Sequence, residues 1–334
     1  MKQLVLPVRF ICNKNLKMKA SKLLWSVLIL IIFRPASGYA QISQIEVSAK
    51  YNPLSKYLPP ADSASKPGKA SQSEFNVGAL VNIHTRIDTA TGRIRSLGSN
   101  IQARYTSFSR DGYNKEILPP ELYALNVGFF YYSTINRKWA YNVFLNTAIN
   151  SDFKEVDKND AFLAGGAVFI RQFTPNFSLG VGAIVHNNLG GFMPWPALTV
   201  DWKMGGKFRL DIRTPDKSAG IAHYVGITYA TSNKWNMSFA FQPEVLSYDV
   251  TTSNERKNRL MSFWQLPFTL SSTIRAGNFE IIPRVGFTAL RRYAYGEKKV
   301  SEMFTEYPYH GLGTNLIYGI GFKYRPSIRA KNSR

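Results

Sequence analysis

The chain has 334 residues, with 42 lysines and arginines against 21 aspartates and glutamates, so its formal net charge is +21. The basic residues are scattered along the chain instead of forming one patch or a basic helix, which argues against a nucleic-acid-binding protein. Cys12 is the only cysteine. No disulfide framework can therefore form within the chain, and stability has to come from core packing or from burial in a membrane.

The first forty residues (1–40) are typical of a secretory signal peptide. They hold seven basic residues and no acidic one, and the apolar run Leu23–Phe33 is followed by small residues up to Ala40. The run is shorter than the ~20 residues that a membrane-spanning helix needs, so we expect cleavage after Ala40 instead of a retained anchor helix. The net charge then falls from +21 to +14, because seven of the 42 basic residues and none of the 21 acidic ones leave. Met18 would open a signal of ordinary length, so residues 1–17 can be a misassigned start.

Behind the signal, apolar and polar residues alternate in short segments. In Phe75–Ile87, phenylalanine, valine, alanine and isoleucine share one face, and asparagine, glycine, histidine and arginine share the other. A period of two is that of a β-strand with one apolar and one polar face. The segments that we expect to be strands are, in chain order, Ser43–Tyr51, Phe75–Ile87, Leu97–Ser107, Leu122–Ser133, Trp139–Ile149, Ala161–Phe173, Phe177–His186, Trp195–Trp202, Phe208–Arg213, Ile221–Ala230, Trp235–Gln242, Ser262–Ser271, Phe279–Leu290 and Thr314–Tyr324.

The connections between these segments alternate in length. Tight turns rich in Asn, Gly, Lys and Pro alternate with longer segments such as Asn52–Gln72 and Pro243–Met261, as periplasmic turns and extracellular loops do in outer-membrane barrels. The connection Thr89–Arg95 is short and is therefore expected on the periplasmic side, so the strand before it runs from the outer face to the periplasm. An earlier strand must first carry the chain from the periplasm to the outer face, and Ser43–Tyr51 can do so. The count is then fourteen strands, or twelve if Ser43–Tyr51 is only an arm.

Aromatic residues recur at the ends of the expected strands. Such rings prefer the membrane–water boundary, whereas a soluble β-sandwich or a lipocalin-like barrel would place its apolar face inward. We therefore expect one all-β domain over residues 41–325, a transmembrane antiparallel up-and-down β-barrel of about 14 strands, and a short basic tail over 326–334. The aromatic residues in question are Trp139, Phe173, Phe177, Trp195, Trp202, Trp235, Phe279 and Tyr324.

An exported barrel of this kind belongs in the outer membrane of a Gram-negative bacterium, which it reaches after secretion through the inner membrane. The partners that we expect are outer-membrane lipid and lipopolysaccharide, periplasmic chaperones and the barrel-assembly machinery. The positive net charge suits an anionic lipopolysaccharide surface better than it suits a nucleic acid.

Three consecutive segments in the middle of the chain carry a resemblance to a known family. They are Pro194–Lys203 (PWPALTVDWK), Lys207–Arg213 (KFRLDIR) and His223–Tyr229 (HYVGITY), in which a strand, a tight turn and an exit toward a loop recur in order. With its signal and without a plug domain, the chain resembles a family of outer-membrane β-barrels from Bacteroidota, a domain family of unknown function. The resemblance implies the fold and the compartment, and no catalytic residue follows from it.

Six charged residues share the polar face of their strands and are our candidates for lining the barrel interior. Charges inside a barrel can brace the wall by pairing across strands, whereas a surplus of four arginines over two acids can favour anions in an open lumen. The segments Phe129–Tyr132 and Ala161–Ile170 are apolar on both faces, which indicates inward packing or a route for an apolar or amphipathic ligand. The six candidates are Arg104, Arg209, Asp211, Arg213, Glu280 and Arg284.

The facing of one strand can be stated residue by residue. In Phe279–Leu290, Val285 shares its parity with other apolar residues and is expected to face lipid, while Gly286 is expected to point inward. We expect Val285→Arg to be costly and Gly286→Ser to be mild.

No residue pattern predicts catalysis, and none predicts a cofactor. His84, His186, His223 and His310 have no metal-ligand spacing, and no glycine-rich nucleotide motif stands between a strand and a helix. The sequence therefore favours a porin-like passive conduit or a binding scaffold for small molecules, without catalysis. Two alternatives remain open: a lipid-modifying barrel enzyme with an exterior serine–histidine pair, and a structural component of an envelope or secretion assembly.

Overall fold

The computed structural model describes residues 41–59, 68–111, 118–155, 157–216, 221–252, 256–299 and 309–326. The expected signal peptide, the alternative start and nearly all of the basic tail lie outside the described residues. No helix within the described ranges is long and apolar enough to span a membrane.

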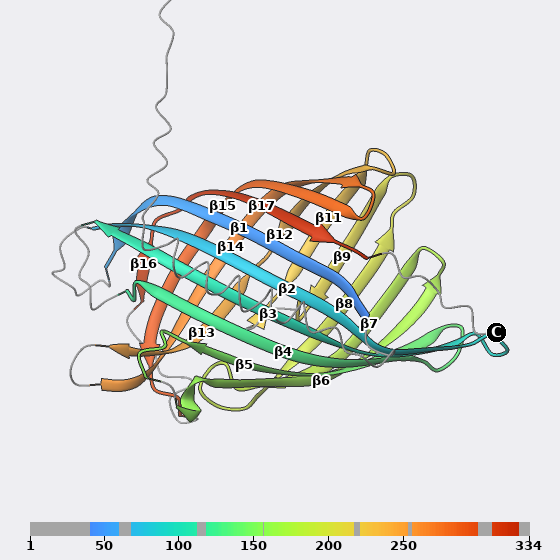
Figure 1. Cartoon of the computed structure of the whole chain (residues 1–334), viewed down its shortest axis with the longest axis horizontal. Coiled ribbons are helices and arrows are strands. Elements are labelled where there is room, and N and C mark those ends of the chain that lie inside the picture. Colours follow the sequence, from blue (N-terminus) through green and yellow to red (C-terminus); the bar gives the residue numbers. More distant parts are fainter. Residues whose placement is uncertain are drawn as a thin grey trace, which may run out of the picture. The chain divides into compact units, whose positions relative to one another are not determined.

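The strands form one sheet that closes on itself (Figure 1). Neighbours pair antiparallel in chain order, and the closure is the pairing of β1 with β17, from Ile45 opposite Tyr324 to Tyr51 opposite Tyr318. The elements are β1 (Gln41–Leu58), β2 (Lys69–Asp88), β3 (Arg93–Asp111), β4 (Glu121–Thr134), β5 (Trp139–Ser151), η1 (Lys158–Asp160), β6 (Ala161–Thr174), β7 (Phe177–His186), β8 (Met193–Lys203), β9 (Phe208–Thr214), β10 (Ile221–Ala222), β11 (Tyr224–Ala230), β12 (Trp235–Phe241), β13 (Glu244–Thr252), β14 (Arg256–Ala276), β15 (Phe279–Gly296), β16 (His310–Leu312) and β17 (Asn315–Tyr324).

The wall has fourteen strand positions, because β10–β11, β12–β13 and β16–β17 are each one chain passage interrupted by a few residues. The expected fourteen-strand barrel is confirmed. The segment Ser43–Tyr51 lies in β1, which pairs on both sides, so it is a wall strand and the twelve-strand alternative is wrong.

Several strands continue well beyond the limits expected from the sequence. β1 extends to Leu58 and β2 starts at Lys69, so most of the expected loop Asn52–Gln72 is paired strand. All the long connections lie at one end of the barrel, which we call the loop end, and the tight turns lie at the other, the turn end. The belt pattern does not reveal these extensions, because their apolar residues, such as Tyr57 and Ala70, are buried inside the barrel and do not face a belt.

The outer surface of the wall carries an apolar belt. Large apolar side chains such as Leu145, Val181, Phe239, Val285 and Leu316 alternate with inward-facing residues and are exposed on the outside. At the turn end this belt is bordered by aromatic rings in contact with one another, Phe173 with Phe177, Phe177 with Trp202, Phe208 with Tyr229 and Phe279 with Tyr324. An apolar band with an aromatic girdle is the surface that a bilayer covers.

One expected girdle residue is not part of that border. Trp195 lies at the loop end of β8 and packs inward against the buried cluster of Val168, Ile184 and Ala197. The sequence could not reveal this, because a tryptophan at a strand end can lie either at a membrane boundary or in a barrel interior.

The segment Pro243–Met261 is a hairpin that crosses the loop end, and not the long loop expected from the sequence. β13 leaves the wall after β12, pairs with β14 and reaches β5, where Asp249 lies opposite Ser151. The Asn150 side chain donates to the carbonyl oxygen of Ser247 at 2.9 Å, which joins the two strands across the mouth. The expectation was wrong because connection length was taken as loop, although Leu246, Tyr248 and Val250 alternate and are buried.

Apolar side chains from the wall and from this hairpin fill the barrel at the loop end. We call this cluster the apolar plug, and it fills the interior on that side within the described part of the chain. Phe108 meets Phe263 edge to face at 5.9 Å between ring centroids. The members are Tyr57, Ala70, Phe108, Leu118, Leu122, Ala124, Ala148, Phe162, Leu246, Tyr248, Val250, Leu260, Met261, Phe263, Tyr293 and Leu312.

Candidate functional site

Below the apolar plug, the described part of the barrel interior contains two adjoining cavities of about 460 and 480 Å³. They share four lining residues, Leu80, Asn100, Arg213 and Asp216. Arg213 is on β9, and Asp216 follows it in a segment that turns into the lumen. The two cavities therefore meet at this segment, and they differ in the chemistry of their walls.

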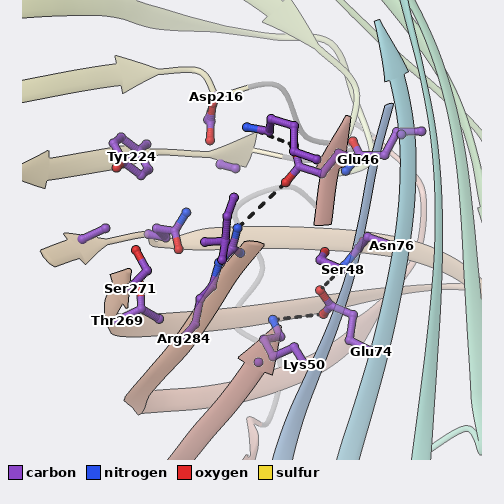
Figure 2. A pocket seen from close by; sticks show the side chains of 18 of the residues that line it. Glu46, Ser48, Lys50, Glu74, Asn76, Asp216, Tyr224, Thr269, Ser271 and Arg284 are labelled. Atoms are coloured by element: carbon purple, nitrogen blue, oxygen red, sulfur yellow. Dashed lines mark hydrogen bonds and ion pairs between the residues drawn. The ribbon is translucent and has the colours of Figure 1, made fainter. Parts of the chain in front are cut away.

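The first cavity, which we call the polar cavity, is lined by charged and hydroxyl-bearing side chains of β1, β2, β11, β14 and β15 (Figure 2). Further charged residues come from β3, β9, β13 and β17. Its described wall holds five basic residues and four acidic ones. This near balance differs from the four arginines and two acids counted from the sequence, because that count missed acids contributed by other strands. The charged residues are Lys50, Arg104, Arg213, Arg284 and Lys323 with Glu46, Glu74, Asp216 and Glu244.

Four of these charges form an ion-pair cluster next to the plug. Lys50 Nζ lies 3.0 Å from Glu74 and 3.7 Å from Glu244, and Arg104 Nη1 lies 3.3 Å from Glu244. Arg104 Nε also donates to the Asn76 side chain at 3.0 Å. Glu244 is the first residue of β13, at the point where the chain leaves the wall. The cluster therefore ties the inward bend of β13 to β1, β2 and β3 on the opposite side.

A second group of charges lies farther toward the turn end. Glu46 faces Lys323 at 3.5 Å and Arg284 at 3.9 Å across the β1–β17–β15 wall, the second of which Figure 2 shows. Arg213 lies 3.3 Å from Asp211 and 3.0 Å from Asp216, and its guanidinium stacks on Tyr224 at 4.3 Å from the ring centroid. Arg213 thus holds the segment with Asp216 against the lumen wall.

The structure places the six expected lining residues as follows. Arg104, Arg213 and Arg284 line the polar cavity. Arg209 lies nearer the turn end, where its guanidinium makes two 2.8 Å hydrogen bonds to Asp201 of β8. Asp211 pairs with Arg213.

Glu280 lies at the turn end of β15. It is buried and pairs with Arg275 and Arg325, each at 3.1 Å. Three of the six residues therefore line the polar cavity, and the other three belong to ion pairs between the cavity and the turn end.

The sequence analysis missed the acids and the lysines that balance these arginines. Glu46 and Lys50 share the polar parity of β1, and Glu74 that of β2, so the same alternation rule could have found them. Glu244 and Asp216 lie in segments that were expected to be loops, and no periodic signal marks them.

The second cavity, which we call the apolar cavity, is lined on β4, β5 and β6 by Phe130, Tyr132, Phe144, Val168 and Ile170. All of them except Phe144 come from the two segments that are apolar on both faces, which leaves apolar side chains inside as well as toward the belt. Apart from Arg213 and Asp216, which line both cavities, the polar side chains at this cavity carry no charge. They are Ser96, Asn100, Asn142, Asn146 and Thr199.

Gly98 on β3 shapes this cavity. A Cβ at Gly98 would lie 2.3 Å from the Phe130 ring, so the absence of a side chain allows that ring to lie flat against the strand.

The four histidines have four different environments, and none bonds to a serine or threonine hydroxyl in the described structure. His84 is exposed on β2. His186 and His223 lie on either side of Trp195, each 6.3 Å from its ring in centroid distance. His310 belongs to the plug region, where its Nδ1 lies 2.6 Å from the Tyr57 hydroxyl.

The comparisons with solved structures return barrels of the outer membrane. A mutant of the monoaromatic hydrocarbon channel TodX has 8% sequence identity and a TM-score of 0.49, over 87% of this chain and 91% of its own. An outer-membrane channel from Pseudomonas putida F1 has 8% identity and a TM-score of 0.43, over 87% and 98%. The transport unit of the autotransporter AIDA-I from Escherichia coli has 10% identity and a TM-score of 0.33, over 92% and 97%.

These identities and TM-scores are too low to carry an argument about function. No curated protein matches the chain. One family model does, and it covers residues 36–325, which include every described strand. The chain therefore belongs to the family described as "Domain of unknown function (DUF6268)".

Proposed function

We propose that this protein is a barrel of the outer membrane that binds small amphipathic molecules in its interior and passes them without catalysis. The observation that carries the proposal is the junction of the polar and apolar cavities at Arg213 and Asp216. A molecule with one polar and one apolar end can place each end in matching surroundings there. Pockets of this size and mixed lining are typical of small-molecule sites.

The closed loop end distinguishes this barrel from an open pore. The apolar plug and the β13–β14 hairpin lie between the cavities and the loop end. A wide water-filled lumen would be lined by polar residues along its whole length. We therefore propose a binding barrel whose plug has to move for passage, and we expect no steady ion conductance from the wild type.

The outer-membrane location rests on the apolar belt, the aromatic girdle and the asymmetry of turns and loops. It implies a Gram-negative source, such as a member of the Bacteroidota, and export with the signal over residues 1–40. The assumed environment is outer-membrane lipid with lipopolysaccharide, reached with the help of periplasmic chaperones and the barrel-assembly machinery.

Binding can be tested with 4-(trifluoromethyl)phenylacetate as the probe, followed by ¹⁹F NMR on the full barrel in lipid nanodiscs. Ile170 lines the apolar cavity, and its neighbour Phe169 points outward into the belt. We expect saturable binding that Ile170→Trp weakens at least tenfold by filling the cavity, while Phe169→Trp leaves it unchanged. Equal binding by both variants, or only non-saturable partition into the lipid, would refute the proposal.

A further inference from the structure

Where β13 reaches across the loop end, its contact with η1 brings three carboxylates together. Asp157 is the N-cap of η1, Asp160 is the last residue of η1, and Asp249 is on β13. One carboxylate oxygen from each lies within 4.8 Å of those of the other two. The three side chains come from two segments about ninety residues apart in sequence, so the fold and not a local loop assembles them.

Two of these carboxylates are deeply buried. Asp160 is 2% exposed and Asp249 is 5% exposed. Asp160 Oδ2 accepts a hydrogen bond from the Asp157 backbone N–H at 2.6 Å. Asp160 Oδ1 is buried without any hydrogen-bond partner. A buried carboxylate oxygen without a hydrogen-bond partner, in a group of three carboxylates, is unfavourable unless a cation lies among them.

Lys298 is the described cation beside these carboxylates, and its ammonium is hydrogen-bonded to backbone carbonyl groups. The Lys298 ammonium donates to the carbonyl oxygens of Asn159 and Ala161, the latter at 2.8 Å, and lies 4.0 Å from the centroid of the Phe162 ring. It forms no ion pair with Asp160 or Asp249 among the described contacts.

We propose that Asp157, Asp160 and Asp249 bind a calcium ion that fastens the β13–β14 hairpin to η1. Calcium takes oxygen ligands at about 2.3–2.6 Å, so two oxygens on the same ion can be up to about 5 Å apart. The carboxylate separations meet this condition without movement of the strands. Asp157 is exposed, so the ion can reach the site from the solvent. Asp160 and Asp249 are buried, and their carboxylates would take the place of water ligands on the side of the ion that faces the protein.

The site would couple calcium to closure of the barrel. Asp249 lies one residue from Tyr248 and Val250, which belong to the apolar plug, and the backbone of β13 meets β5 at the same residue. An ion shared by Asp249 and the η1 carboxylates thus holds the plug-bearing strand in its crossing position. This inference concerns the loop end and does not depend on what the two cavities bind.

Calcium binding can be measured by isothermal titration calorimetry with CaCl₂ on the folded full-length barrel in detergent, after treatment with EDTA and its removal. We expect one ion per chain with a Kd of about 0.1–1 mM, the range of extracellular calcium modules. Asp160→Asn and Asp249→Asn should each weaken binding at least tenfold. Asp88→Asn, at an exposed turn-end aspartate, is the matched control and should leave binding unchanged. Heat-modifiable migration on gels checks that every variant folds.

The coupling to the hairpin has its own measurement. Ser247 is buried on β13 beside Asn150. In a Cys12→Ser background, calcium should slow maleimide labelling of Ser247→Cys at least threefold, and this protection should vanish with Asp160→Asn. Absence of saturable calcium heat, or equal affinity in Asp160→Asn and Asp88→Asn, would overturn the site. Calcium binding without protection of Ser247→Cys would overturn its role in fastening the hairpin.

Discussion

Arg104 and Arg209 are both inward-facing arginines paired with carboxylates, and their variants should differ sharply in stability. Arg104 is 8% exposed and lies between Glu74 and Glu244, at 4.0 and 3.3 Å. Arg209 makes two short hydrogen bonds to Asp201, yet the side chains are 51% and 42% exposed. The better geometry thus belongs to the exposed pair.

Removal of one partner from a buried ion pair costs about 3–5 kcal/mol, because the other charge is left without compensation. In Arg104→Met, Lys50 still faces Glu74 at 3.0 Å and Glu244 at 3.7 Å, so we expect the lower limit, about 3 kcal/mol. An exposed pair contributes about 0–1 kcal/mol, and Arg209→Met should stay within that range. Glu244→Gln added to Arg104→Met should recover part of the loss, because no buried charge then stays unmatched.

The assay is urea unfolding of the barrel refolded into lipid vesicles, followed by tryptophan fluorescence and extrapolated linearly to water. Arg104→Met, Arg209→Met and the double variant should be compared at the same ionic strength. If Arg209→Met were as destabilising as Arg104→Met, burial would not decide the strength of these pairs. If Glu244→Gln deepened the loss, the crossing of β13 would depend on Glu244 in some way other than its charge.

Three further outcomes follow from the wall. Val285 is exposed midway along β15 in the apolar belt, so Val285→Arg should cost about 2–4 kcal/mol in the same unfolding assay. Gly286→Ser should also destabilise the barrel, because a Cβ there would lie 2.0 Å from the carbonyl oxygen of Phe268. This differs from the mild effect expected from the sequence. A Gly286→Ser barrel with wild-type stability would contradict this packing. Cysteines introduced at Phe192 and Asn233, at opposite ends, should differ in whole-cell labelling by an impermeant maleimide, with only Phe192→Cys reacting.

Period-two alternation predicted the wall because every membrane-height strand has one face toward the belt and one toward the interior. The alternation of short and long connections then indicated that one more strand, β1, precedes β2. Its pairing with β17 closes the barrel. Alternation was not applied to β13, because the long connection Pro243–Met261 was taken as a loop. Leu246, Tyr248 and Val250 alternate as clearly as residues in the wall, but their apolar face covers the plug and not lipid.

The interior charges could be assigned to a face but not to partners. Arg104 and Glu244 are 140 residues apart, and they meet only because β13 crosses the lumen. Alternation along one strand carries no information about such a contact. A count of charges strand by strand therefore gave a surplus of arginines, whereas the described polar cavity nearly balances them with acids from β1, β2 and β13.

Unequal strand lengths explain why the barrel closes at its loop end. β2, β3 and β14 have 20, 19 and 21 residues, whereas β9, β11 and β12 have 7 each. A strand crosses a bilayer with about 9–11 residues, so one side of the wall rises well beyond the belt and the other ends within it. The chain that continues from β12 pairs with the β10–β11 passage only at Glu244 and Val245. Beyond Val245 its apolar side chains are buried against the tall side. Where β13 crosses to β5, its backbone pairs with that strand at Asp249 and its apolar side chains are buried. The apolar plug results from this crossing.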